Sequence, residues 1–286
     1  MPALSQIALS VGRLERSVDW YRQVLGMRPT GSTALFRGPV MGKVTGIPGP
    51  VSRCAWLVDC QRRFQLELFE FSRPEPRRRK PVPEPGRIGY RSMVVRVDDF
   101  DLVLRSNGAP VAVEGQPGGR RAILHDPDGN PVEVTEADPR EPGRCRQRSG
   151  IPCAVRGVVA SVPDLDRTRR FFGDALGLRE ANGPFQRTAF WADDIAIEFD
   201  HCPNAEPWPN GYRLSDIGFL NVAFAWPGRA GFRHAANRIR RSGYRLVSRP
   251  VDLRLGGVVY AEDDQGFSVE LGYQSRFAAT RLGFLE

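Results

Sequence analysis

Four glutamates are the residues of this 286-residue chain whose setting most suggests chemistry. Each lies at the centre of a short strand-like segment, QLELF, PVEVT, AIEFD or SVELG, and the four are Glu67, Glu133, Glu198 and Glu270. Glutamate is almost never fully buried unless it is paired. Carboxylates in such positions can hold a hard divalent cation, and two close carboxyls can exchange a proton because one pKa is raised. The four segments therefore mark the candidate site.

Each glutamate segment follows a second repeated segment, an apolar strand that leads into a helix. These strands are QIALSV, SMVVRV, GVVASV and NVAFAW, and they begin at Gln6, Ser92, Gly157 and Asn221. The separation from that first residue to the glutamate is 41 residues in the second and third copies, 49 in the fourth and 61 in the first. Repetition at such a period indicates one small unit that was copied four times.

Every unit has the order strand, helix and about three strands. The clearest helix is predicted over residues 12–26, where apolar residues recur at steps of three or four and a glycine ends the stripe. Similar stripes predict helices over 164–177, 100–107 and 230–242. The chain is therefore predicted to have an α+β fold built from four βαβββ units.

Two polar linkers divide the chain. Residues 72–89 are rich in proline and arginine and join the first two units, whereas residues 137–152 join the two halves. The linkers predict two domains, residues 1–138 and 151–286, each made of two units. Because one chain supplies all four units, dimerisation is not required. Both a monomer and a homodimer are compatible with this organisation.

The composition argues against several classes of protein. The net charge is +8, but 39 of the 41 basic residues are arginine, and no nucleic-acid-binding motif accompanies them, so we expect no nucleic-acid partner. No apolar run reaches the roughly 20 residues of a membrane span, and no signal-peptide pattern begins the chain. The five cysteines are odd in number and lack CxxC spacing, which favours reduced thiols and a cytoplasmic protein.

Two motifs carry a resemblance to a known family. The segments LSVGRLERSVDWYRQVLGM (residues 9–27) and HDPDGNPVEV (residues 125–134) resemble the vicinal oxygen chelate superfamily. That superfamily includes glyoxalase I, fosfomycin and bleomycin resistance proteins, and extradiol dioxygenases. The resemblance extends over nearly the whole chain. It implies that βαβββ units pair into two half-barrel clefts, and we expect each half of the chain to form one of them.

The resemblance also implies a metal site at the first and last strands of the paired units. The matching positions are Gln6, Glu67, Ser92 and Glu133 in the N-terminal half, and Gly157, Glu198, Asn221 and Glu270 in the C-terminal half. The family usually has histidine at the first-strand positions, and all four are missing here. The N-terminal set is the expected metal site, and its oxygen ligands favour Mn²⁺ or Mg²⁺, with Fe²⁺ as a further possibility. Iron-dependent ring cleavage of the usual kind is not expected, because it needs two histidines.

Two functions are left open by the sequence. The first is an enzyme, a lyase, isomerase or dioxygenase-like protein, that acts on a small oxygen-bearing, possibly aromatic metabolite. The second is a non-catalytic protein that sequesters a small molecule or antibiotic, and in both cases the partner is a small molecule. The candidate acid–base residues are Glu133, Glu198, Glu270 and His201. The candidate pocket residues are Asn221, Tyr260 and Tyr273.

Overall fold

The computed structural model describes residues 2–78, 86–137, 150–183, 187–207, 213–253 and 256–274. The predicted α+β fold and its four βαβββ units are confirmed. In the described residues no helix is long and apolar enough to cross a membrane.

The elements follow one another as four similar units. The first holds β1 (Ala3–Ser10), α1 (Leu14–Val24), β2 (Arg28–Arg37), α2 (Pro39–Thr45), β3 (Val51–Val58) and β4 (Gln65–Arg73). The second holds β5 (Gly89–Val97), α3 (Phe100–Asn107), β6 (Val113–Glu114), β7 (Arg121–His125) and β8 (Pro131–Glu136). The third holds β9 (Cys153–Val162), α4 (Leu165–Thr168), the π-helix η1 (Arg169–Ala175), β10 (Arg179–Asn182), β11 (Thr188–Ala192) and β12 (Ile195–His201). The fourth holds β13 (Gly218–Ala225), α5 (Arg229–Arg241), β14 (Arg245–Leu246), β15 (Val251–Leu253), β16 (Gly256–Glu262) and β17 (Ser268–Gln274).

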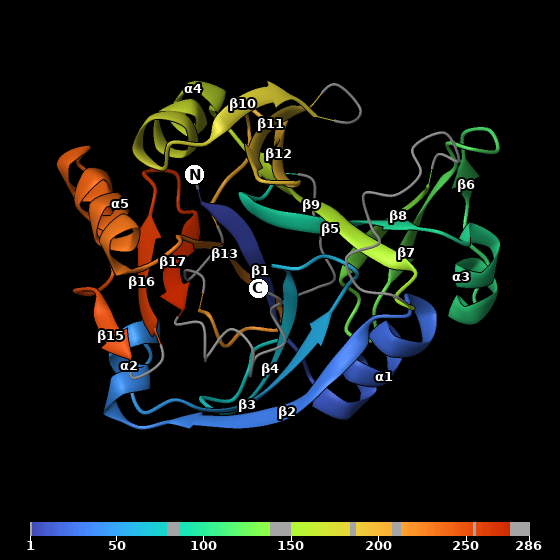
Figure 1. The fold of residues 1–286 in the computed structure, drawn as a ribbon, viewed down its shortest axis with the longest axis horizontal. Helices are drawn as coiled ribbons and strands as arrows, with labels where there is room; N and C mark the ends of the chain where they lie inside the picture. The colour runs from blue at the N-terminus through green and yellow to red at the C-terminus, as the bar shows by residue number, and fades with distance from the viewer. Residues whose placement is uncertain are drawn as a thin grey trace.

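The units pair across the halves of the chain. One sheet has the order β14-β16-β17-β13-β1-β4-β3-β2 with β15 beside β16, and the other has the order β10-β11-β12-β9-β5-β8-β7-β6. The first unit therefore shares a sheet with the fourth, and the second shares a sheet with the third. Figure 1 shows this directly, because the blue strands lie beside the orange and red ones, and the green strands lie beside the yellow ones. The expectation that consecutive units pair within each half is wrong.

The first strand of each unit occupies a central place in its sheet. β1 pairs antiparallel with β13 and parallel with β4, and β9 pairs in the same two ways with β5 and β12. All eight residues of β1 are buried. Strands that are flanked on both sides and covered on both faces read as nearly continuous apolar runs, as these four do in the sequence. The first strands form the joins between units, and this central place explains why they are buried and apolar.

Helices cover the outer face of each sheet. Leu14, Tyr21 and Val24 form the buried stripe of α1, which packs on β3 and β4. Tyr21 also donates a hydrogen bond from its hydroxyl to Asp126 Oδ2 (3.1 Å), so it ties the first unit to the turn between β7 and β8. In the fourth unit, α5 packs in the same way on β16 and β17. The opposite, inner face of each sheet is thereby left for the glutamates.

The helix of the third unit departs from its prediction. The single α-helix expected over residues 164–177 is instead the short α4 followed by η1, with the wider hydrogen bond from Leu176 N to Phe171 O (2.9 Å). Gly173 lies inside η1, where an added Cβ would come within 3.4 Å of the Phe190 ring. Such π-helical turns accommodate close packing inside an otherwise α-helical segment.

The loop between β3 and β4 fastens the two sheets to one another. Buried Asp59 accepts hydrogen bonds from Gln61 Nε2 (2.6 Å) and from the backbone N–H of Val155 in β9 (2.7 Å). The bond to Val155 connects the N-terminal half of the chain to the C-terminal half.

The neighbouring Cys60 is disulfide-bonded, which corrects the expectation that all cysteines are reduced thiols.

The crossed pairing makes a prediction about fragments. Neither residues 1–138 nor residues 151–286 contain a complete sheet, and each half alone would expose the unpaired edges of central apolar strands. Each fragment expressed alone is therefore expected to lack a cooperative unfolding transition, whereas the two mixed together should recover the circular dichroism of the intact chain. A folded, monomeric 1–138 fragment would show that the pairing seen here is not required.

Candidate functional site

The crossed sheets sort the predicted positions into two new groups. Gln6 and Glu67 meet Asn221 and Glu270 on the inner face of the larger sheet, which we call the first site. Ser92 and Glu133 meet Glu198 in the other sheet, beside Gly157, and these form the second site. The predicted metal set Gln6, Glu67, Ser92 and Glu133 is not brought together, because its first pair and second pair belong to different sheets.

The strand register explains why the first-site residues converge. Ala8 lies opposite both Glu67 of β4 and Asn221 of β13, and Ala223 lies opposite both Gln6 and Glu270. Residues directly opposite or two apart share a face of the sheet. Four polar side chains from β1, β4, β13 and β17 therefore lie together on the inner face.

Neutral donors hold the two carboxyls of the first site. Gln6 Nε2 donates to Glu67 Oε1 (2.8 Å), and Trp56 Nε1 donates to the same oxygen (2.5 Å). On the other side of the join, Asn221 Nδ2 donates to Glu270 Oε2 (3.3 Å). Such bonds fix the orientation of the carboxyls without neutralising their charge.

Burial and mutual repulsion favour the protonated form of this pair. Burial is the main cause that raises the pKa of Glu67 to about 8, the nearby Glu270 raises it further, and the Trp56 hydrogen bond opposes both. Burial also raises the pKa of Glu270, against hydrogen bonds with Tyr260 and Asn221. Two carboxyls so placed cannot both ionise cheaply, so the pair holds a proton near neutral pH unless another cation replaces it.

Apolar and aromatic side chains surround the pair. Trp56 and Phe69 both pack against Phe36, with ring centroids 6.2 Å and 5.7 Å apart, respectively. Helix α2 contacts both β2 and β16, and in Figure 1 it lies between the end of β2 and the β15–β16 edge of the same sheet. The helix contributes Val44 to an apolar cluster that includes Tyr260. The first site therefore lies in apolar and aromatic surroundings.

One polar group beside the first site has no partner. Gln65 shares the inner face with Glu67, and its Oε1 accepts a hydrogen bond from Gln6 Nε2 (3.1 Å). Its own Nε2 is buried and has no hydrogen-bond partner among the described residues. An unsatisfied buried donor costs about 1–3 kcal/mol, so a bound oxygen atom would be stabilising there.

The donors of the first site fit a hard divalent cation. Two carboxylates and two amide oxygens are available from Gln6, Glu67, Asn221 and Glu270, once a half-turn of the amides presents their oxygens. In the described part of the chain no basic side chain contributes to the pKa shift of either glutamate. No cluster of three or more His, Cys, Asp or Glu suited to a metal occurs there either, so the amides would have to complete the set.

The second site already contains a cation. Arg187 Nη1 donates to Glu133 Oε2 (3.4 Å) and to Glu198 Oε2 (3.5 Å), and Arg187 Nε donates to Asp200 Oδ1 (2.9 Å). Ser92 Oγ donates to the other oxygen of Glu133 (2.6 Å). Burial raises the pKa of Glu198 to about 7, although Arg187 opposes that shift. This arrangement does not fit a metal ion, because a guanidinium stands between the carboxylates.

Two predicted site residues lie outside both sites. His201 is exposed at the end of β12, and its Nε2 lies 3.1 Å from the carbonyl oxygen of Pro163. It is three residues after Glu198, so its side chain lies on the opposite face of the strand. Tyr273 lies on the outer face, where its ring packs on Phe232 of α5 at 5.3 Å. Both assignments are corrected by the alternation of side chains along a strand. Tyr260 and Asn221, in contrast, lie next to Glu270 as the pocket assignment requires.

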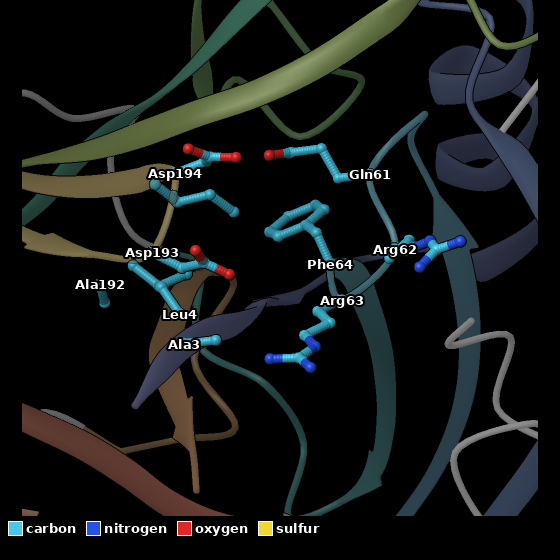
Figure 2. A pocket seen from close by; sticks show the side chains of 10 residues that line it. Ala3, Leu4, Gln61, Arg62, Arg63, Phe64, Ala192, Asp193 and Asp194 are labelled. Atoms are coloured by element: carbon cyan, nitrogen blue, oxygen red, sulfur yellow. The ribbon is translucent and has the colours of Figure 1, made fainter. Parts of the chain in front are cut away.

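A separate pocket lies at the seam between the sheets. It has a volume of about 280 Å³ and is lined by the start of β1, the β3–β4 loop and the β11–β12 turn. In Figure 2 the side chains of Gln61 and Asp194 face one another across it, whereas Arg62 points away. None of the residues of the two glutamate sites lines it.

The raised pKa of Glu67 predicts how stability depends on pH. The folded protein holds this proton more tightly than the unfolded chain does, so the free energy of unfolding should fall as pH rises from about 4.5 to about 8 in the presence of a chelator. Glu67→Gln removes the group and should flatten this loss, which is on the order of a few kcal/mol, in urea unfolding. Glu114→Gln, at an exposed carboxyl, is the control. An unchanged slope in Glu67→Gln would contradict a protonated pair.

Comparisons with known proteins agree with this architecture. The Glyoxalase/Bleomycin resistance protein/Dioxygenase superfamily matches residues 3–134 and 155–271. A putative dioxygenase from Bacillus subtilis is 15% identical, with a TM-score of 0.67 over 95% of this chain and 85% of that one. Glyoxalase I from Zea mays is 17% identical, with a TM-score of 0.63 over 98% and 95% of the two chains, and no curated protein matches. Because the family match covers most of the sequence, the chain belongs to the Glyoxalase/Bleomycin resistance protein/Dioxygenase superfamily.

Proposed function

We propose that the protein is an enzyme of the lyase or isomerase kind that acts on a small, oxygen-bearing aromatic metabolite at the first site. One observation carries this proposal: Glu67 and Glu270 face one another in an aromatic environment, and burial raises both pKa values. A carboxyl whose pKa lies near the working pH can both take and return a proton. Perturbed pairs of this kind are concentrated at active sites.

The aromatic side chains and the unsatisfied donor beside the first site indicate what it would bind. An aromatic ring would pack against Trp56 and Phe69, both of which face the inside of the sheet. An oxygen of the same molecule would accept a hydrogen bond from the unsatisfied Gln65 Nε2. Together these contacts favour a flat ligand with a carbonyl or hydroxyl group at one end.

The family association with divalent metals suits this position. Gln6, Glu67, Asn221 and Glu270 would hold the ion, which when bound would polarise a substrate oxygen. Without the ion, the amide hydrogen bonds from Gln6 and Asn221 orient the two carboxyls. We favour proton transfer over iron-dependent oxygen chemistry, because the first-strand positions of the first site, where the family usually has histidine, hold Gln6 and Asn221.

The chain's own groups suffice to describe the proton transfer. A carbon next to a carbonyl would be deprotonated by the ionised member of the Glu67–Glu270 pair. The other member, or Tyr260 beside it, would donate a hydrogen bond to the oxygen on which charge develops. The cover of α2 excludes water from the reacting groups and so strengthens these interactions.

A second candidate function is binding without turnover. The aromatic inner face and the apolar cluster beneath α2 are sufficient to retain an apolar ligand. In that case the protein would sequester a small molecule, as bleomycin resistance proteins do. Retention of two buried glutamates that cost stability favours the enzymatic candidate, because a purely apolar pocket would bind such a ligand without them.

Hydrogen–deuterium exchange separates the two candidates. We would incubate the protein with aryl α-hydroxyketones in D₂O, with and without Mn²⁺, and follow the proton next to the carbonyl by NMR. The proposal predicts exchange that falls at least 100-fold in Glu270→Gln and Glu67→Gln, since general acid–base catalysis contributes roughly 10²–10⁴-fold. Glu133→Gln, which alters the second site, should retain the wild-type rate. Saturable binding without exchange would favour sequestration, and exchange that persists in both variants would contradict the proposed base.

A further inference from the structure

The two glutamate sites are equivalent in their strand register. Ala8 and Ala223 of the first site correspond to Val94 and Val159 of the second, because each pair lies opposite the two glutamates of its sheet. Two residues before these positions stand Gln6 and Asn221 in one site. The second site has Ser92 and Gly157 there instead. The two sites therefore started from one plan and differ in what occupies them.

The second site differs most in its charge. Arg187 Nη1 contacts one oxygen of Glu133 and one of Glu198 at nearly equal distances, 3.4 Å and 3.5 Å. The Arg187 side chain is only 17% exposed and Glu198 only 2%, so the guanidinium is largely shielded from water. In the first site no basic side chain among the described residues takes this place between the carboxyls.

The backbone around Glu198 is shaped for this arrangement. At Gly157 an added Cβ would lie 2.7 Å from the carbonyl oxygen of Ala196 and 3.5 Å from Glu198 Oε1. At Gly183 an added Cβ would lie 2.9 Å from the Ala189 Cβ and 3.4 Å from Glu198 Cδ. The N–H of Gly183 also donates a hydrogen bond to Arg187 O (2.8 Å), which helps to position the arginine. Both glycines thus leave room for the buried ion pair.

We propose that Arg187 is the resident cation of the second site: its guanidinium takes the place of a divalent metal between Glu133 and Glu198. The guanidinium neutralises the two carboxylates and fills the space between them, so a metal would have to displace a charge already satisfied by three acidic groups. The chain therefore carries one site open to metal and one closed by its own side chain. This inference concerns the second site, so it goes beyond the function proposed for the first.

Removal of the arginine should convert the second site into a metal site. In Arg187→Ala the carboxylates of Glu133 and Glu198 would lose the counter-charge that lies between them, and carboxylate oxygens are ligands that a hard ion prefers. Bound Mn²⁺ can be counted from the loss of the electron paramagnetic resonance signal of the free ion. The expected result is one more bound ion per chain than in wild type, with a rise in melting temperature on adding Mn²⁺.

Matched variants localise the added ion. Adding Glu133→Gln to Arg187→Ala should remove the extra ion. Arg91→Ala deletes another arginine of the same cluster, which pairs with Asp200 (3.0 Å), and should add none. Arg187→Gln keeps a polar side chain without the charge and should gain the ion as well. It replaces the alanine variant in this test if circular dichroism shows that Arg187→Ala is unfolded.

The outcomes separate this inference from the proposed function. Folded Arg187→Ala and Arg187→Gln proteins that bind no more Mn²⁺ than wild type would overturn the inference, as would an equal gain in Arg91→Ala. One ion in wild type that is lost in Glu67→Ala supports the metal at the first site. No ion in wild type with one in Arg187→Ala would uphold the inference while removing the metal from the proposed function.

Discussion

The antiparallel join between β1 and β13 is the constraint on which the first site depends. It brings the first and last units of the chain into one sheet and so places Glu67 of β4 and Glu270 of β17 on the same inner face. Buried carboxyls of this kind are tolerated only where the surrounding structure fixes them, and here Gln6, Trp56 and Asn221 do so with neutral hydrogen bonds. The cost of holding two like groups in an apolar setting is what raises their pKa values.

The two sheets resolve the same electrostatic problem in different ways. The second site neutralises its glutamates internally with Arg187, whereas the first leaves its pair to a proton, a cation or a ligand. The two sites share one strand register and differ in the side chains that occupy it. The aromatic side chains and the apolar residues of α2 also lie at the first site.

The sequence predicts the units well and their pairing poorly. The apolar stripe of α1, the boundaries of α3 and the four glutamate strands follow from periodicity alone. Which units share a sheet depends on contacts between strands more than 200 residues apart, such as that of Gln6 with Ala223, and local patterns carry no information on them. Trp56 lies directly opposite Glu67, but the sequence alone does not give this register, and Arg187 belongs to no recognisable sequence motif. His201 and Tyr273 each lie three residues after a glutamate, and this odd separation puts their side chains on the opposite face of the strand.

The most direct test is a carbon-13 NMR titration of glutamate side-chain carboxyls in the presence of a chelator, with the two signals assigned from Glu67→Gln and Glu270→Gln. One carboxyl of the pair is expected to remain protonated at pH 7. Glu270→Gln is expected to lower the pKa of Glu67, because a repulsive neighbour is removed while burial remains. Two carboxyls that titrate independently near the ordinary value of about 4.3 would contradict the account, because they would show that the crossed sheets do not bring the glutamates together in a buried site.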